Sequence, residues 1–294
     1  MGRSRGVGHR ADDNETRLTG SSPAGGLTGG GTSARCPATR GEARAGRLLL
    51  YRDDFQIRLA NQKWRSKSQQ LVERMYSWRG YKCEPGEAAG CEAGAAVTVQ
   101  ACSAQDVFGT LNVGFDSPRG LTCEALYSAE VRAFRDRGAT AAEFTRLAVE
   151  PERGSKELLG AVFHVAYLFA ACVGNATDMF IEVNPRHVGF YKRMLNFSPV
   201  GECKMCERVE APAVLLHLEV AYMREQVALS GGHRGTDRRS LYPYFCAPEE
   251  EAAIIGQIAS LGLRGHSVDV LPLRGGRPHA LGLRRDRRLQ STAA

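Results

Sequence analysis

The chain has 294 residues, a net charge of +7 and nine cysteines, and this length allows one or two domains. It contains no run of 18 apolar residues, so no membrane span is predicted, and its N-terminus lacks the apolar core of a secretory signal. The irregular cysteine spacing favours a reducing compartment over a disulfide framework, which predicts a cytoplasmic protein. The single Cys203-x-x-Cys206 pair has no second pair at zinc-site spacing, and we expect no metal site.

Charge and composition separate two tails from one central domain. Residues 1–47 contain eight Arg and four acidic residues, and residues 264–294 contain seven Arg and two Asp, which leaves −2 for the middle. Both tails have few large apolar side chains and cannot offset the entropy cost of ordering. We expect a disordered tail over 1–47, a domain over 48–262 and an Arg/Gly-rich tail over 263–294. Because the basic charge belongs to the tails, it predicts no specific nucleic-acid partner.

Hydrophobic periodicity predicts strands and helices along the whole domain. The expected strands are 55–60, 97–101, 108–115, 143–149, 179–183, 198–200 and 213–220, with a hairpin between the second and third. The expected helices are 69–81, 121–137, 158–173, a short helix that holds Tyr191, and 222–229. Ser117 and Pro118 form a start signal for the second helix. The succession of strand, helix and strand from 143 to 183 predicts a βαβ crossover on a parallel sheet.

Three charged residues stand inside strands that are otherwise apolar: Glu143, Arg146 and Glu182. A buried charge is costly unless it is paired or used, so these residues are candidates for a functional site. Glu182 and Asn184 are two residues apart and share a face of their strand. They stand at its carboxyl end, where α/β sheets bind ligands.

The end of the central stretch carries a resemblance to a known superfamily. Asn184, Gly189, Tyr191 and Asn196-Phe197 resemble the Asn…Ala…Tyr…Gly-Phe signature of GNAT acyltransferases, and the order of elements is similar to that fold. The resemblance implies an α/β (α+β) domain with a mixed central sheet and helices on both faces. It also implies that Tyr191 lies near the sulfur of a bound thioester.

A narrower resemblance is to the long-chain N-acyl amino acid synthases, a GNAT branch related to acyl-homoserine lactone synthases. The similar segments are 114–118, 143–149, 181–187, 190–195 and 208–216, with 240–245 resembling a bacterial branch found beside exopolysaccharide and exosortase protein-sorting systems. This resemblance implies transfer of a long-chain acyl group from an acyl carrier protein to the α-amine of an amino acid. The alternatives are acyl-homoserine lactone synthesis and a non-catalytic, acyl-binding domain.

The segment expected to bind the phosphates of the donor departs from the usual GNAT loop. It reads Pro151-Glu-Arg-Gly-Ser-Lys156 and keeps a single Gly. One phosphate fits Arg153, Lys156 and the following helix N-terminus better than the pyrophosphate of coenzyme A does. The expected donor is therefore the phosphopantetheine thioester of an acyl carrier protein, with acyl-CoA as the alternative. No permanently bound cofactor is expected.

The catalytic candidates each have a structural alternative. Aminolysis of a thioester needs a deprotonated amine, a stabilised oxyanion and an acid for the leaving thiolate. Glu143 is expected to deprotonate or orient the amine, unless it only forms an ion pair with Arg146. Since residues three apart on a flat strand point to opposite faces, a β-bulge is needed to bring these two together. Tyr191 is expected to be the acid, unless it only packs against Leu195 and Phe197.

The candidates for substrate binding are open to the same question. Asn184 either holds the pantetheine amide or caps the following helix. Glu182 either steers the acceptor ammonium or pairs with Arg186, and Asp116 either binds the acceptor or closes a turn. Four apolar residues are candidates for an acyl tunnel or for ordinary core: Leu71, Met75, Trp78 and Phe108.

Overall fold

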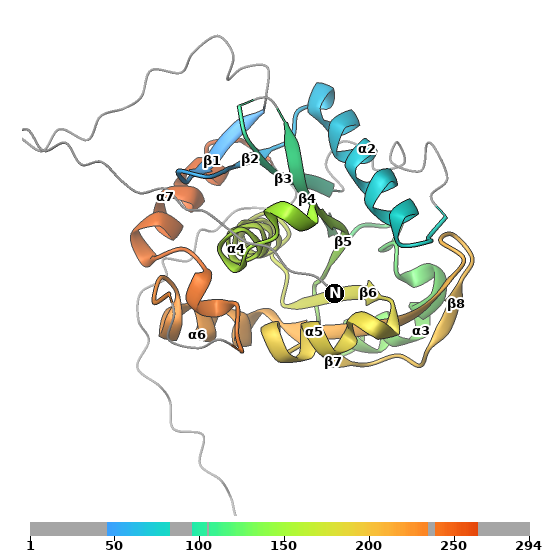
Figure 1. Cartoon of the computed structure of the whole chain (residues 1–294). Coiled ribbons are helices and arrows are strands. Elements are labelled where there is room, and N and C mark those ends of the chain that lie inside the picture. Colours follow the sequence, from blue (N-terminus) through green and yellow to red (C-terminus); the bar gives the residue numbers. More distant parts are fainter. Residues whose placement is uncertain (1–45, 83–95, 105, 235–238, 264–294) are drawn as a thin grey trace, which may run out of the picture. The chain divides into compact units, whose positions relative to one another are not determined.

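The computed structural model describes residues 46–82, 96–104, 106–234 and 239–263 (Figure 1). Almost all of the two predicted tails lies outside these ranges, so their disorder stays a prediction. The strands are β1 Arg47–Tyr51, β2 Gln56–Leu59, β3 Ala96–Cys102, β4 Val107–Phe115, β5 Ala141–Val149, β6 Asp178–Val183, β7 Ser198–Pro199, β8 Lys204–Cys206 and β9 Ala211–Glu219. The helices are α2 Gln62–Trp78, α3 Glu124–Arg135, α4 Lys156–Cys172, α5 Pro185–Leu195, α6 Val220–Ser230 and α7 Pro248–Ala259, with 3-10 turns η2 Pro151–Arg153 and η3 Tyr242–Tyr244.

All of these strands belong to one mixed sheet in the order β1-β2-β3-β4-β5-β6-β9-β7, with β8 paired to β9. Strands β5 and β6 are parallel and are joined through α4, which confirms the predicted βαβ crossover. The predicted hairpin is also present, since β3 pairs with β4 antiparallel. The sequence did not predict β1, β8 and α7.

Helices cover both faces of the sheet, as expected. Helix α4 packs against β3 and β4 in the largest apolar cluster, and nearly all of its residues are buried, which explains why its sequence has no amphipathic stripe. Helices α2 and α3 form two smaller clusters, which include Ala148 and Ala141 of β5 respectively. Ala142, the next residue along β5, belongs to the α4 cluster, because successive strand residues point to opposite faces.

The structure corrects the starts of two predicted helices. Ser117 and Pro118 open a turn rather than a helix: the Ser117 hydroxyl accepts from the Arg119 N–H, and Gly120 adopts a positive φ of 77°. Helix α3 therefore begins at Glu124. Helix α2 begins at Gln62, earlier than predicted, because the Asn61 side chain caps it by accepting from the backbone N–H of Trp64.

The C-terminal part of the described chain is packed onto α4. His164, buried in that helix, accepts from the Cys246 N–H through Nδ1 at 2.8 Å and contacts Glu251 of α7 through Nε2 at 3.0 Å. Gly160 lies so close to Tyr244 that a Cβ on it would be 2.6 Å from the Tyr244 carbonyl oxygen. Within the described residues, no helix is both long and apolar enough to cross a bilayer.

Strand β5 departs from regular pairing on both of its edges. The predicted bulge is present, since the register with β4 shifts between Thr145 and Ala148, and Arg146 within it has a φ of 55°. On the other edge, the pairs between β5 and β6 run only as far as Phe144 and Ile181, although β5 continues to Val149. The two parallel strands therefore part at their carboxyl ends.

Candidate active site

A cavity of about 530 Å³ lies where β5 and β6 part. Its wall is formed by α2, the strands β3 to β6, the two residues before α3, the turn before α4 and Leu159 within α4, the helix α5, and the segment from Arg208 to β9. The predicted site residues that line it are Glu143, Arg146, Glu182, Asn184 and Tyr191. Those that do not line it are Asp116, Arg153 and Lys156.

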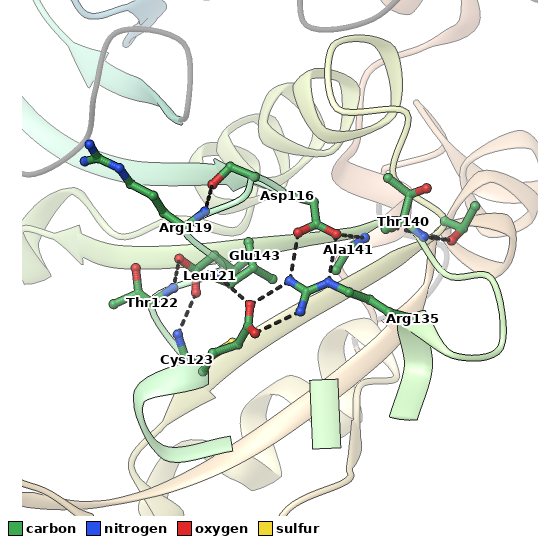
Figure 2. Close-up of polar contacts among 12 residues, drawn as sticks. Asp116, Arg119, Leu121, Thr122, Cys123, Arg135, Thr140, Ala141 and Glu143 are labelled. Carbon is green, nitrogen blue, oxygen red and sulfur yellow. Dashed lines mark hydrogen bonds and ion pairs between the residues drawn. The ribbon is translucent and has the colours of Figure 1, made fainter. Parts of the chain in front are cut away.

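Glu143 is buried in this wall, and its carboxylate is held by the backbone (Figure 2). Oε1 accepts from the N–H of Thr122 at 2.7 Å, and Oε2 accepts from the N–H of Cys123 at 3.0 Å. Gly114 on β4 leaves room for the side chain, because a Cβ there would lie 2.8 Å from Glu143 Cγ. The arrangement fixes a negative charge beside the cavity and ties β5 to the start of α3.

Asp116 lies outside the cavity wall and helps to hold that same segment in place. Its carboxylate accepts from Arg135 at 2.7 and 3.0 Å, and Arg135 also donates to Glu124 at 2.6 and 2.8 Å (Figure 2). The contact with Arg135 is the main reason why the pKa of Glu124 is lowered. The position of Asp116 thus supports the turn-closing alternative and gives no support to a role in acceptor binding.

Glu182 projects from β6 into the cavity wall and contacts Arg208, which precedes β9. The Nη2–Oε1 distance is 3.3 Å, and the Glu182 side chain is 10% exposed. This corrects the suggested pairing with Arg186, whose guanidinium instead donates to the Tyr81 hydroxyl at 2.6 Å. Burial raises the pKa of Glu182, while Arg208 lowers it.

Asn184 is the N-cap of α5. Its Oδ1 accepts from the Arg186 N–H at 3.2 Å, and its Nδ2 donates to the Pro212 carbonyl at 3.2 Å. With Pro185 in the first turn and Asn196 in the left-handed conformation at the end, α5 has standard signals at both termini. The capping alternative is therefore observed, and a contact with pantetheine stays a prediction.

Tyr191 lies on α5 with its ring on the cavity wall. The ring makes edge contacts with Phe163, Phe190 and Phe197, at centroid distances of 6.3, 5.2 and 6.1 Å. Burial, and secondarily Tyr76, raises the pKa of the Tyr191 phenol, so the hydroxyl holds its proton at neutral pH. This geometry meets the first requirement of an acid for a leaving thiolate.

The basic residues of the degenerate phosphate loop point elsewhere. The Arg153 guanidinium lies 4.9 Å from the centroid of the Phe108 ring, and the Lys156 ammonium lies 5.5 Å from that of Tyr244. Between them, Gly154 reaches the cavity wall. The start of α4 is capped by Ser155, which accepts from the Leu158 N–H at 3.1 Å.

Of the two alternatives for the four apolar candidates, the structure supports ordinary core for three and neither for Trp78. Trp78 is 69% exposed, while Leu71, Met75 and Phe108 are buried in core clusters and do not line the cavity. A different face of α2 and the facing helices supply the apolar wall: Val72, Tyr76, Leu159 and Phe190. For the three candidates on α2, the sequence did not say which flank of the apolar stripe faces the cavity.

Three further residues of the wall were not predicted from the sequence. For Arg208 the available signal was its place in the family-like segment 208–216, and its pairing with Glu182 is seen only in the structure. Thr122 and Cys123 contribute backbone N–H groups, which no residue type reveals. Burial, reinforced by Glu143, raises the pKa of the Cys123 thiol, so it is a neutral thiol and a poor nucleophile.

The described residues contain no group of three or more His, Cys, Asp or Glu that could hold a metal ion.

Comparisons with known proteins identify the family and the fold of the chain. A family model described as N-acyl amino acid synthase FeeM matches residues 67–219, just over half of the 294-residue chain. The structure of FeeM, an N-acyl amino acid synthase from uncultured soil microbes, has 24% identity and a TM-score of 0.54, covering 58% of this chain and 94% of that one. This likeness shows the GNAT-type α/β fold.

Two other solved structures are similar at lower scores. The AHL synthase LasI has 11% identity and a TM-score of 0.43, covering 56% of this chain and 90% of its own. An acetyltransferase of the GNAT family from Streptococcus pneumoniae has 13% identity and a TM-score of 0.40, covering 56% and 99%. No curated protein matches the chain.

Proposed function

The chain belongs to the FeeM family of N-acyl amino acid synthases and is an acyltransferase; from this premise we propose that it joins a long-chain fatty acyl group to the α-amine of an amino acid. The donor is the phosphopantetheine thioester of an acyl carrier protein. The product is an N-acyl amino acid, and the reaction takes place in the cytoplasm, where acyl carrier proteins are charged.

The parting of β5 and β6 is the single observation that carries this proposal. Beyond Phe144 the edge of β5 has no pairs with β6, and the cavity occupies the space between the two strands. An extended arm with amide groups, such as pantetheine, is suited to bind along a free strand edge through main-chain hydrogen bonds. The thioester at the tip of the arm would then reach the part of the cavity wall that Glu143 and Tyr191 line.

The polar residues of the wall supply a group that orients the amine and an acid for the leaving thiolate. The fixed negative charge of Glu143 orients the acceptor ammonium, and Tyr191 gives its proton to the sulfur as the C–S bond breaks. Arg146, turned by the bulge, and Asn184, at the end of β6, border the donor arm. The apolar flank of the cavity, which includes Val72 and its neighbours, accommodates the fatty chain.

Two features support a carrier protein over free coenzyme A. The loop at 151–156 has one Gly, and the single helix N-terminus that follows suits one phosphate, with Arg153 and Lys156 beside it. A pyrophosphate would need a second set of backbone N–H groups in the same loop. The Arg153 and Lys156 side chains would leave their present aromatic contacts to reach that phosphate.

The test is turnover by the purified full chain with defined donors and a panel of amino acids, with products identified by mass spectrometry. Palmitoyl-acyl carrier protein is expected to give N-palmitoyl amino acids faster than palmitoyl-CoA and much faster than acetyl-CoA. Equal or faster use of acetyl-CoA would contradict the long-chain, carrier-dependent donor. A lactone product with S-adenosylmethionine would favour acyl-homoserine lactone synthesis, and binding without turnover would favour an acyl-binding domain.

A further inference from the structure

Two carboxylates border the cavity on neighbouring parallel strands, and their surroundings differ. In the register of β5 and β6, Glu143 pairs with Phe180, so Glu182, two residues further on, lies on the same face of the sheet toward its open end. Both side chains line the cavity. The two groups therefore face one space but have different partners.

Both carboxylate oxygens of Glu143 are already occupied by backbone donors. Each of its oxygens accepts a backbone N–H, from Thr122 at 2.7 Å and from Cys123 at 3.0 Å. Protonation would place an O–H against one of these donors and break a contact that joins β5 to the start of α3. Glu143 is therefore an anchor of the backbone before α3 as well as a part of the cavity wall.

Glu182 is held by side chains instead of the backbone, namely the Arg208 guanidinium and the Cys206 thiol. Its contact with Arg208 is 3.3 Å long, whereas charge-assisted hydrogen bonds of good geometry are about 2.7–2.9 Å. Arg208 comes from the segment between β8 and β9, and its side chain is 30% exposed at the cavity wall. A guanidinium in this position is able to exchange one carboxylate partner for another.

We propose that Glu182 and Arg208 together form the acceptor site: Arg208 binds the α-carboxylate of the amino acid, and Glu182 accepts the first proton of its α-ammonium. The inference rests on the proposed function and names the groups that recognise its acceptor. The site selects α-amino acids over amines that lack a carboxylate.

The charged and titratable groups around Glu182 are compatible with its role as the base. Burial raises the pKa of Glu182, and Glu143 on β5 raises it further, while Arg208 and the thiol of Cys206 lower it. When the substrate carboxylate engages Arg208, Glu182 loses part of the attraction that favours its charged form. The acceptor thereby makes Glu182 a stronger base at the moment when its ammonium must lose a proton.

The protons lost and gained in the transfer balance. The ammonium loses one proton to Glu182, and the neutral nitrogen forms the C–N bond with the thioester carbonyl carbon. The nitrogen then loses a second proton as the C–S bond breaks, which balances the proton taken up by the leaving thiolate through Tyr191. The products are the amide, the free thiol and one proton, which Glu182 releases to solvent.

The experiment measures kcat and KM for the full chain with a long-chain acyl carrier protein, using an amino acid, its carboxamide and its decarboxylated amine as acceptors. For the unaltered chain, kcat/KM for the amino acid is expected to exceed that of the carboxamide by on the order of 10- to 100-fold, the effect of one charged hydrogen bond. Arg208→Gln should bring this ratio close to one. Glu207→Gln, next in sequence and exposed, is the control and should keep it.

Glu182→Gln should lower kcat by on the order of 10²-fold or more and keep the preference for a carboxylate. It should also remove the acidic limb of the pH profile of kcat/KM, whereas Glu143→Gln should keep that limb. Loss of the limb in Glu143→Gln alone, or an unchanged acceptor ratio in Arg208→Gln, would overturn the assignment. If the unaltered chain transfers no acyl group to any amino acid, the proposed function itself fails, and that outcome is separate from failure of the variants.

Discussion

At the scale of single residues, Glu143 has two roles, one in the reaction and one in stability, and two measurements on one variant separate them. Its carboxylate supplies charge to the cavity, and it satisfies the backbone N–H groups of Thr122 and of the buried Cys123. In Glu143→Gln, the amide NH₂ cannot accept, so one backbone N–H loses its partner. We expect the free energy of unfolding to fall by about 1–3 kcal/mol. The transfer rate should fall by on the order of 10²-fold, because the charge that orients the ammonium is lost.

Chemical denaturation and initial rates per folded molecule measure these two effects of Glu143→Gln. The control is Glu152→Gln, a change at an exposed glutamate in η2 that should alter neither quantity. A normal rate together with lower stability would leave Glu143 as an anchor of α3 without a part in the reaction.

Tyr191→Phe removes the phenol proton and keeps the ring. The ring contacts with Phe163 and Phe197 are retained, so thermal stability should change little. If the phenol protonates the leaving thiolate, turnover should fall by on the order of 10²-fold or more. Donors with a more acidic thiol need this proton less, so the loss should shrink with them. A variant that keeps its rate per folded molecule but melts at lower temperature would make Tyr191 a packing residue.

At the scale of elements, the contact between α4 and the C-terminal segment depends on Gly160. A Gly in the middle of a helix usually costs about 0.5–1 kcal/mol relative to Ala. Here a Cβ would lie 2.6 Å from the backbone oxygen of Tyr244, so there is no room for it. We expect Gly160→Ala to destabilise the fold by roughly 1–3 kcal/mol, as overpacking of a core does.

Gly256→Ala is the matched control for this prediction. Gly256 is an exposed position of α7 where a Cβ would meet nothing within 4 Å. The same substitution should therefore stabilise the protein by about 0.5–1 kcal/mol. Thermal unfolding of the two variants measures the difference, and a gain in stability from Gly160→Ala would refute the tight approach of α4 and η3.

At the scale of the whole molecule, a chain trimmed to residues 46–263 should fold and keep its activity. Its first residues belong to the fold, since Arg58 donates to the Gly46 carbonyl at 3.0 Å and Arg47 donates to the Ser260 hydroxyl at 2.6 Å. A second chain trimmed to 52–263 lacks β1 and the buried Leu49 and Leu50, and it should lose cooperative unfolding. Calorimetry of both chains checks this. Loss of activity in the longer one would assign a function to the tails.

The sequence by itself determined the parts of the protein that depend on local signals. Periodicity located the βαβ unit and the hairpin, because one buried face imposes a repeat of 2.0 or 3.6 residues. Asn184 and Pro185 marked the start of α5 by cap chemistry that needs only neighbours in sequence. Charges inside apolar strands marked Glu143 and Glu182, and the family resemblance supplied the fold class and Tyr191; all three residues line the cavity.

Only the tertiary structure decided which groups these residues meet. Glu143 finds its partners 20 and 21 residues away, and Glu182 pairs with a residue 26 positions further along the chain. The phase of α2 against the sheet, which excluded Trp78 from the cavity, was likewise undecided by the pattern of its stripe. These contacts depend on the register of the strands and on where two strands separate. A local repeat in the sequence encodes which face a residue occupies, but it does not encode which distant residue is packed beside it.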